Sequence, residues 1–115
     1  MNKTLEDAFE NEMSLGKFFY FSADFINSFS HFERAHVLGQ RYVIPHTRTH
    51  FWMLRIGIKR RDIKEIVGQL FRIPVGMIGS AIGIVPTGNT GGSNVNALLK
   101  MKIPMDLQKT IDGDK

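Results

Sequence analysis

The spacing of apolar residues constrains this chain most, because it follows a helical repeat almost without interruption up to about residue 85. The clearest run joins five phenylalanines and a histidine at steps of three or four residues: Phe18, Phe21, Phe25, Phe29, Phe32 and His36. Residues at these steps share one face of an α-helix, so the run predicts one long helix that ends near Gly39. An aromatic face of this kind is more typical of a protein core than of a cofactor site, and we interpret it as core.

Three further helices are expected around this one. The first has an apolar face made of residues at helical spacing: Leu5, Ala8, Phe9 and Met13. Gly16 should end that helix. Pro45 suits the first turn of a third helix that reaches about residue 58, and Asp62 can cap a fourth. Pro74 should either kink or end the fourth helix.

The predicted fold is therefore all-α, with two antiparallel helical hairpins in tetratricopeptide-like packing, followed by a glycine-rich loop and an irregular C-terminal tail. Leu15-Gly16 and Ile56-Gly57, 41 residues apart, should mark the equivalent tight turns between the paired helices. We expect residues 1–115 to form a single helical domain, in which 86–115 is a loop and tail that pack back on the bundle.

Residues 73–86, IPVGMIGSAIGIVP, form a short apolar segment rich in small side chains. Its roughly 14 residues are too few for a helix that crosses a membrane, which needs about 20. Gly79 and Gly83 would instead allow close contact with another helix. We expect this segment to be buried against the first hairpin, and we expect no transmembrane span.

Composition and charge exclude several classes of protein. The chain has no cysteine, which excludes disulfides, thiol nucleophiles, iron–sulfur clusters and cysteine-based zinc sites. Most of its net charge of +4 comes from a basic middle segment, but no aromatic and basic motif of a nucleic-acid reader accompanies it, so nucleic acid is disfavoured as a partner. The acidic, amphipathic start lacks the features of a signal peptide, and we expect a cytoplasmic location.

The candidate site lies in the segment FERAHVLGQRYVIPHTRTHF, residues 32–51. His46 and His50 are four residues apart, which places both imidazoles on one helix face, where they can reach one metal ion. Glu33 and His36 share a face of the preceding helix, and a short connection brings the two pairs together. These four side chains are the predicted ligands of one transition-metal ion, whether Zn, Fe, Co, Ni or Cu. Two glutamines would support the ligands by hydrogen bonding: Gln40 and Gln69.

Other interpretations of the same residues stay open. The histidines could be structural and donate to free carbonyl groups at a helix junction, with Glu33 paired to a nearby arginine: Arg34, Arg41 or Arg48. His31 lies off the shared face and is left out of the site. No serine lies in an elbow motif, so no catalytic residue is assigned and a metal handler is favoured over an enzyme. An acid–base site of histidine and glutamate without metal also remains possible.

Two further features are weaker candidates. The loop TGNTGGSN could direct backbone amides at an anion through Gly88, Asn89, Thr90, Gly91 and Gly92. It lacks the lysine-serine/threonine ending of a P-loop, and its asparagines are more typical of side chains that bond within their own turn. The second feature is a basic turn that could bind a protein partner: Arg55, Lys59, Arg60, Arg61 and Lys64. The alternative function is thus a non-enzymatic helical-hairpin interaction module that binds another protein or forms a homodimer.

Four sequence blocks, FERAHVLGQR, PHTRTHFWML, EIVGQLFR and PTGNTGGSNV, resemble a family of short bacterial proteins catalogued only as a domain of unknown function. The resemblance covers about residues 5–107 and rests on the order of the blocks. It implies a small, mostly helical cytosolic protein and brings no established activity. The polar candidates and the loop 88–94 lie within these blocks. Phe32 departs from the leucine that is frequent in this family, which changes core filling and leaves the polar set intact.

Overall fold

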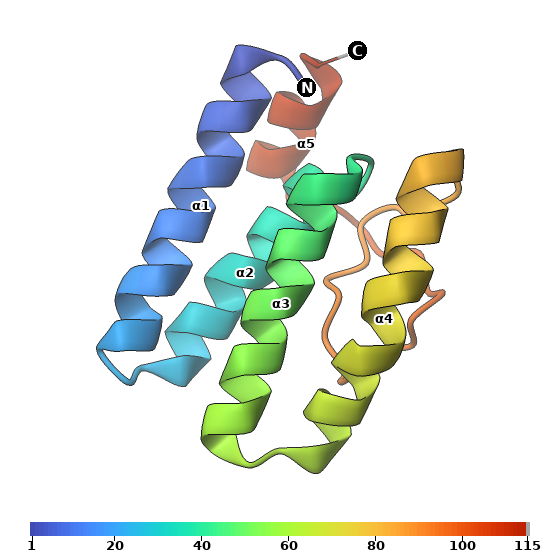
Figure 1. Cartoon of the computed structure of the whole chain (residues 1–115). Helices are drawn as coiled ribbons and strands as arrows, with labels where there is room; N and C mark the ends of the chain where they lie inside the picture. Colours follow the sequence, from blue (N-terminus) through green and yellow to red (C-terminus); the bar gives the residue numbers. More distant parts are fainter. Residues whose placement is uncertain (115) are drawn as a thin grey trace.

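The structure is a computed structural model and describes residues 1–114. The described part contains five α-helices and no strand: α1 (Lys3–Phe21), α2 (Phe25–Gly39), α3 (Val43–Arg60), α4 (Ile63–Ile82) and α5 (Met105–Asp112). Helices α1 and α2 pair as one hairpin, α3 and α4 pair as a second, and contacts between α2 and α3 join the two (Figure 1). The prediction of an all-α fold built from two helical hairpins is confirmed.

The first hairpin turn lies at residues 22–24, so the prediction of one long helix through the phenylalanine run is wrong. Ala23 adopts a left-handed conformation with φ of 59°, which an α-helix cannot accommodate. The carboxylate of Asp24 then accepts a hydrogen bond from the backbone amide of Asn27 at 3.1 Å. This N-cap starts α2 inside the phenylalanine run, because it satisfies an amide that has no partner within the helix.

The split divides the phenylalanine run between core and surface. Phe32 on α2 is completely buried, whereas Phe18 and Phe21 on α1 are 62% and 72% exposed. Tyr20 lies on the other side of α1 and is buried in their place. The interpretation of the whole run as core therefore holds for its second half and is wrong for its first.

Gly16 and Gly57 do not end helices, contrary to the prediction, but they are equivalent in another way. Each lies inside a helix, where it contacts the second helix of its own hairpin. A Cβ on Gly16 would lie 2.6 Å from the Phe32 ring, and one on Gly57 would lie 3.3 Å from Glu65. The Ser28 hydroxyl also donates to the Gly16 carbonyl at 2.7 Å. Both glycines thus permit close approach of paired helices.

The second hairpin turn has the same backbone conformation and the same type of cap as the first. Arg61 is left-handed with φ of 54°, and Asp62 follows it as the predicted cap of α4, accepting from the Glu65 amide at 3.1 Å. A left-handed residue other than glycine before a capping aspartate therefore ends the first helix of each hairpin.

Replacing Arg61 by glycine should raise the free energy of unfolding by about 0.5–1 kcal/mol. The left-handed conformation costs a residue with a Cβ roughly 1–2 kcal/mol, which exceeds the added chain entropy of glycine. The measurement is urea denaturation followed by circular dichroism. Arg60→Gly is the matched control, since Arg60 is the last helical residue of α3 and the same substitution there should lower stability by up to about 1 kcal/mol. Equal effects at the two positions would contradict this explanation of the turn.

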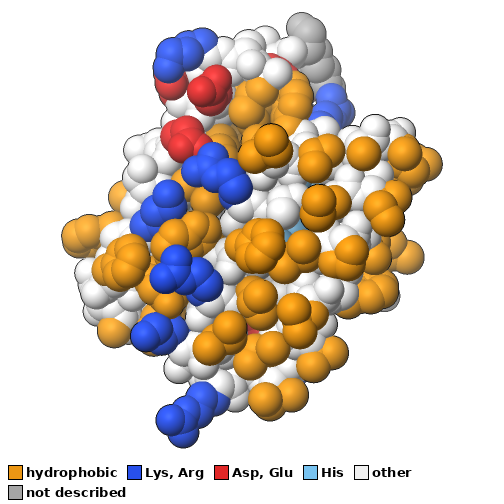
Figure 2. Space-filling view, viewed as in Figure 1, with side chains coloured by type: hydrophobic (Ala, Val, Ile, Leu, Met, Phe, Trp, Pro, Cys, Tyr) orange, Lys and Arg blue, Asp and Glu red, His pale blue; other side chains and the backbone are white. Residues whose placement is uncertain are grey.

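Helix α4 continues through Pro74 to Ile82 and ends at Gly83, which is left-handed with φ of 79°. Its buried residues are polar: Glu65, Gln69 and Ser80. Its apolar residues face outward, so the expectation that residues 73–86 are buried against the first hairpin is wrong for most of the segment. Figure 2 shows apolar side chains spread over the side of the molecule that α4 occupies.

By length and composition alone, α4 could cross a membrane. It has 20 residues and a mean hydropathy of 1.2 in its most apolar window, of which 17% is buried. One helix that meets these criteria of length and composition is weak evidence for a membrane span. No clear membrane span is indicated in the described residues.

The C-terminal tail is not wholly irregular, since it contains α5. Leu107 and Ile111 of this helix are buried in the same core as Leu5 and Phe9, against α1 and α2. Side-chain hydrogen bonds hold its two ends, from Arg34 to Asp106 and from Tyr42 to Asp114. Asn2 also bonds Gly113 and Asp114, so the N-terminus and the end of α5 lie close together at one end of the bundle (Figure 1).

Candidate metal centre

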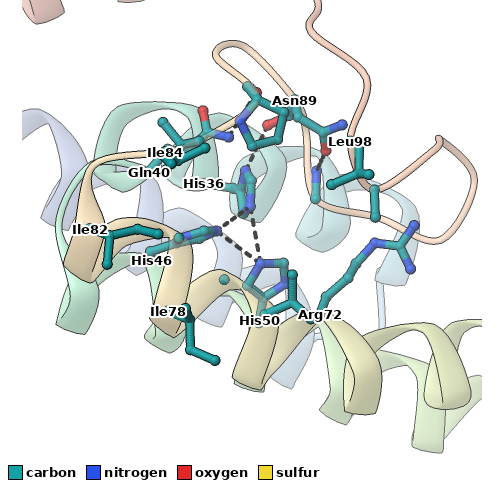
Figure 3. Close-up of a pocket in the computed structure, with 17 residues that line it drawn as sticks. His36, Gln40, His46, His50, Arg72, Ile78, Ile82, Ile84, Asn89 and Leu98 are labelled. Carbon is teal, nitrogen blue, oxygen red and sulfur yellow. Dashed lines mark hydrogen bonds between the residues drawn. The ribbon is translucent and has the colours of Figure 1, made fainter.

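Three histidines meet in the core between the two hairpins. His36 comes from α2, and His46 and His50 come from α3. Their Nε2 atoms form a nearly equilateral triangle, with separations of 2.9 Å for His36–His46 and 3.1 Å for the other two pairs. The three side chains are only 2–4% exposed. Figure 3 shows the three rings pointing at one another from two helices.

The local sequence explains how the rings converge. The four-residue spacing places His46 above His50 on one face of α3, as predicted. Only three residues separate α2 from α3, so the end of one helix is next to the start of the other. Gly39 makes this approach possible, because a Cβ there would lie 2.8 Å from the Pro45 ring. His36, one turn before Gly39, is thereby held opposite the two histidines of α3.

Hydrogen bonds at Nδ1 fix two of the rings. His36 Nδ1 lies 2.7 Å from the backbone carbonyl oxygen of Asn89, and His50 Nδ1 lies 2.6 Å from Oε1 of Gln69. The Gln69 amide nitrogen donates to Glu65 and to the Gly91 carbonyl, which fixes its oxygen toward His50. Both acceptor atoms are oxygens without a hydrogen, so the Nδ1 atoms of His36 and His50 must carry the hydrogens.

The third ring is fixed through a serine on α4. His46 Nδ1 lies 2.7 Å from the Ser80 hydroxyl, and that hydroxyl donates its hydrogen to the Gln40 carbonyl at 2.7 Å. The serine oxygen can therefore only accept from the imidazole, and His46 also carries its hydrogen on Nδ1. All three Nε2 lone pairs consequently point at the centre of the triangle.

Burial keeps these imidazoles neutral. It lowers the pKa of His46 to about 3 and that of His50 to about 4, and it lowers the pKa of His36 well below its usual value. The neighbouring histidines add to the shift at His36 and His46, because protonation of one ring would disfavour protonation of the next. Three neutral rings with facing lone pairs repel one another, and a cation between them would turn this repulsion into coordination.

The triangle fits a metal ion with tetrahedral geometry. Two nitrogens bound at 2.0–2.1 Å to one tetrahedral zinc ion lie about 3.3 Å apart, only a few tenths of an ångström more than the distances here. The histidines would thus occupy three tetrahedral positions and leave the fourth to another group.

The glycine-rich loop supports this centre from outside. Gly91 is left-handed with φ of 89°, and a Cβ there would lie 2.5 Å from the His36 ring. The Asn89 side chain holds the loop in place by donating to two carbonyls, of Asn96 and Leu99, at 2.8 Å each. The loop backbone therefore packs directly on His36 while Asn89 presents its carbonyl to that ring.

The structure does not bring Glu33 into the triangle. Of the described residues, only the three histidines form a compact group of potential ligands that includes this centre. Glu33 lies one turn before His36 and is directed toward the loop, where burial raises the pKa of its carboxyl group and the nearby Glu65 adds to that shift. Pairing of Glu33 with Arg34 or Arg48 is also wrong. Arg34 binds Glu12 and Asp106, and Arg48 binds Glu10.

The two glutamines have different places. Gln69 contacts His50 directly, as a supporting residue should. Gln40 supports the centre only through its backbone, because its side chain donates to the Pro86 carbonyl and accepts from the Gly88 amide. His31 lies away from the triangle, where it bonds Glu12 at 2.7 Å.

Several loop amides proposed for anion binding already have acceptors inside the protein. The Gly88 amide donates to Gln40, the Asn89 amide to the Pro86 carbonyl, and the Gly91 amide to the Asn89 side chain. These contacts give the loop a structural role in the centre. The basic residues from Arg55 to Lys64 are exposed around the α3–α4 turn, and Arg55 covers the Trp52 ring at 4.2 Å.

Sequence reasoning missed Ser80 and the Asn89 carbonyl. The sequence could have identified Ser80, since it is the one hydroxyl residue in the otherwise apolar segment 73–86 and a buried hydroxyl needs a hydrogen-bond partner. A backbone carbonyl in an irregular loop carries no such signal, because every residue has one. Neither contact follows from helical spacing.

A cavity of about 260 Å³ opens from the triangle to the surface. The three histidines and Asn89 lie at its inner end, and Arg72 lies on one wall. The remaining walls are mostly aliphatic, with Ile78, Ile82, Ile84 and Leu98 around the opening (Figure 3).

These features define a small all-helical protein in which two hairpins and a glycine-rich loop hold a buried cluster of three histidines. Residues 3–111 match the family described as "Protein of unknown function (DUF3703)", and the chain belongs to that family. The resemblance to a family of unknown function is thereby confirmed, while the bacterial origin and the cytoplasmic location stay predictions. None of the curated proteins and none of the solved structures matches the chain.

Proposed function

We propose that this protein binds one transition-metal ion through the Nε2 atoms of His36, His46 and His50. One observation carries the proposal: three neutral, buried imidazoles direct their lone pairs at one point, with Nε2 atoms 2.9–3.1 Å apart. A histidine with a purely structural role needs only a hydrogen bond to one neighbour, and it gains no stability from an Nε2 lone pair that faces two others. Each ring also donates its Nδ1 hydrogen to an oxygen, which is the arrangement that orients histidine ligands in metalloproteins.

The ligand set narrows the choice of ion. Three imidazoles without thiolate or carboxylate suit Zn, Cu, Fe, Co or Ni and disfavour Mg and Ca, which prefer oxygen ligands. A tetrahedral preference and the small triangle favour zinc, for which Co²⁺ is a useful spectroscopic substitute. Gln69 then acts as a hydrogen-bonding support, and Glu33 takes no part in coordination.

The test is titration of the purified, chelator-treated protein with Co²⁺ and Zn²⁺. We expect one equivalent of Co²⁺ to give the visible absorption of a tetrahedral complex, and Zn²⁺ to displace it. The double variant His46→Ala/His50→Ala should lose this signal. His31→Gln is the matched control, since His31 lies outside the triangle and this variant should bind as the wild type does.

Two outcomes would overturn the proposal. One is a wild-type protein that binds no transition metal above background. The other is binding that survives loss of both His46 and His50 while circular dichroism shows an intact fold. If the double variant unfolds, the single variants His46→Gln and His50→Gln provide the comparison, because glutamine keeps polar packing without an imidazole ligand.

A second candidate function is that of a helical-hairpin interaction module. The observation in its favour is the outward apolar face of α4, where Ile63, Val67, Leu70 and Phe71 are each more than half exposed. This face adjoins the basic turn, so a protein partner or a second copy of the chain could cover both. If the chain forms a homodimer through this face, reversing the charges of Arg60 and Arg61 should abolish the dimer in sedimentation experiments without loss of helix content. A wild-type protein that sediments as a monomer would contradict the homodimer.

A further inference from the structure

We propose that the fourth coordination position of the metal takes the carboxylate of a small monocarboxylate whose aliphatic chain fills the cavity beside the three histidines. This inference rests on the proposed metal site and deepens it. No further histidine, aspartate or glutamate of the described residues joins the three histidines as a fourth ligand. The group that completes the coordination must therefore enter from outside, and the cavity is the route that reaches it.

The charge of the site favours an anion. A divalent ion bound by three neutral imidazoles keeps two positive charges in a buried position, which is costly unless a negative group neutralises it in part. Glu65 supports the histidines through Gln69, and its oxygens already accept from Gln69, from the Ser93 amide and from the Ser93 hydroxyl. It therefore does not coordinate.

Arg72 adds a further positive charge on the cavity wall. Its two terminal nitrogens donate to the backbone carbonyls of Gly68 and Val95, at 3.2 and 2.7 Å. Its Nε is buried and has no hydrogen-bond partner among the described residues. The side chain is thus fixed at the cavity with its Nε–H unused. Its positive charge, like that of the metal, favours a negative head group.

The walls select an apolar chain. Around the opening, Ile78 and Ile82 are each 63% exposed, Ile84 is 73% exposed and Leu98 is 75% exposed. Aliphatic side chains this exposed gain free energy when an apolar group covers them. The cavity of about 260 Å³ holds roughly eight or nine groups of the size of a water molecule. A carboxylate of about that many heavy atoms would fill the cavity.

The experiment uses the Co²⁺-loaded full-length protein, titrated with straight-chain carboxylates from acetate to octanoate and followed by the visible absorption of the metal. We expect affinity to rise about three- to fourfold for each added methylene and to level off near eight heavy atoms. Octylamine and octanol should leave the spectrum unchanged, because they lack the anionic head group.

Variants distinguish the contribution of the ligand's aliphatic chain to binding from that of its carboxylate. Ile78→Ser/Ile82→Ser should reduce the gain per methylene while azide, a small anion without a chain, binds with unchanged affinity. Ile63→Ser is the matched control, since Ile63 is equally exposed on α4 but is not part of the cavity. Arg72→Gln should weaken every carboxylate by about the same factor without changing the dependence on chain length.

Failure of the metal site and failure of the carboxylate proposal would give different results. If the wild type shows no tetrahedral Co²⁺ spectrum, the metal site itself is refuted and the inference falls with it. If Co²⁺ binds but acetate and octanoate bind equally, or only azide binds, the metal site stands and the aliphatic carboxylate is refuted. An octylamine or octanol response as strong as that of octanoate would refute the charge argument.

Discussion

Replacing Gly91 by alanine should lower both the stability of the protein and its affinity for metal. The left-handed backbone of Gly91 costs an alanine roughly 1–2 kcal/mol, and the added Cβ would lie 2.5 Å from the His36 ring. The ring or the loop has to move, so we expect a total loss of about 3 kcal/mol in the free energy of unfolding. Because His36 then loses its alignment with the other two rings, metal affinity should fall about 10–100-fold.

A second glycine separates the backbone effect from the contact with His36. Gly83 is also left-handed, with φ of 79°, but a Cβ there meets no atom within 4 Å. Gly83→Ala should therefore cost only about 1–2 kcal/mol and leave metal affinity unchanged. Urea denaturation and Co²⁺ titration of both variants give the comparison. Equal metal affinities for the two would show that the loop does not position His36.

The parts of the fold that follow from local spacing could be predicted from the sequence. Apolar residues at steps of three and four identify helices, and the four-residue step between His46 and His50 places two rings on one face whatever the rest of the chain does. Asp62 was recognisable as a cap because the helical pattern begins directly after it. The pairing of helices into two hairpins then follows from the short connections.

The first turn shows why helix limits are harder to predict. The helical pattern runs through Ala23 without a break, and nothing in the periodicity separates Phe21 from Phe25. The decisive feature is Asp24, whose cap on the Asn27 backbone amide competes with helix continuation. The turn was predicted at Gly16 because glycine often ends helices. Glycine also allows two helices to approach closely, and only tertiary packing decides between these roles.

Glu33 shows the corresponding limit for the site. Residues three apart on a helix share a face, but Glu33 precedes His36 by about 4.5 Å along the helix axis. The rings of α3 meet His36 at its own level, so the carboxylate one turn away faces the loop. The groups that hold the three Nδ1 atoms come from segments far apart in sequence: Gln69 and Ser80 on α4, and the Asn89 carbonyl in the loop. Of these, only Gln69 was predicted. Such contacts depend on the packed structure, which helical spacing does not encode.

Acid should destabilise the metal-free protein steeply, because the folded state holds three neutral histidines that the unfolded state can protonate. The folded pKa values of His46 and His50 are about 3 and 4, that of His36 is also lowered, and the unfolded value is near 6.5. Below pH 6.5 the unfolded chain therefore binds more protons than the folded one. The stability contributed by neutral histidines is fully present above that pH and is lost as the pH falls toward 4. Between pH 7 and pH 5.5 we expect a loss on the order of 3–4 kcal/mol.

The measurement is urea denaturation in EDTA at several pH values, with the slope of unfolding free energy against pH as the readout. His46→Gln should reduce that slope by about one third, whatever it does to stability at pH 7, because one of three titrating groups is gone.

Glu33 contributes to the pH dependence of stability with the opposite sign. Its raised pKa favours the folded state at low pH, and that contribution is lost as the pH rises, so Glu33→Gln should make the acid loss slightly steeper. A wild-type slope at pH 5.5 that corresponds to fewer than two protons would contradict burial of three neutral rings, and with it the array of lone pairs on which the metal site depends.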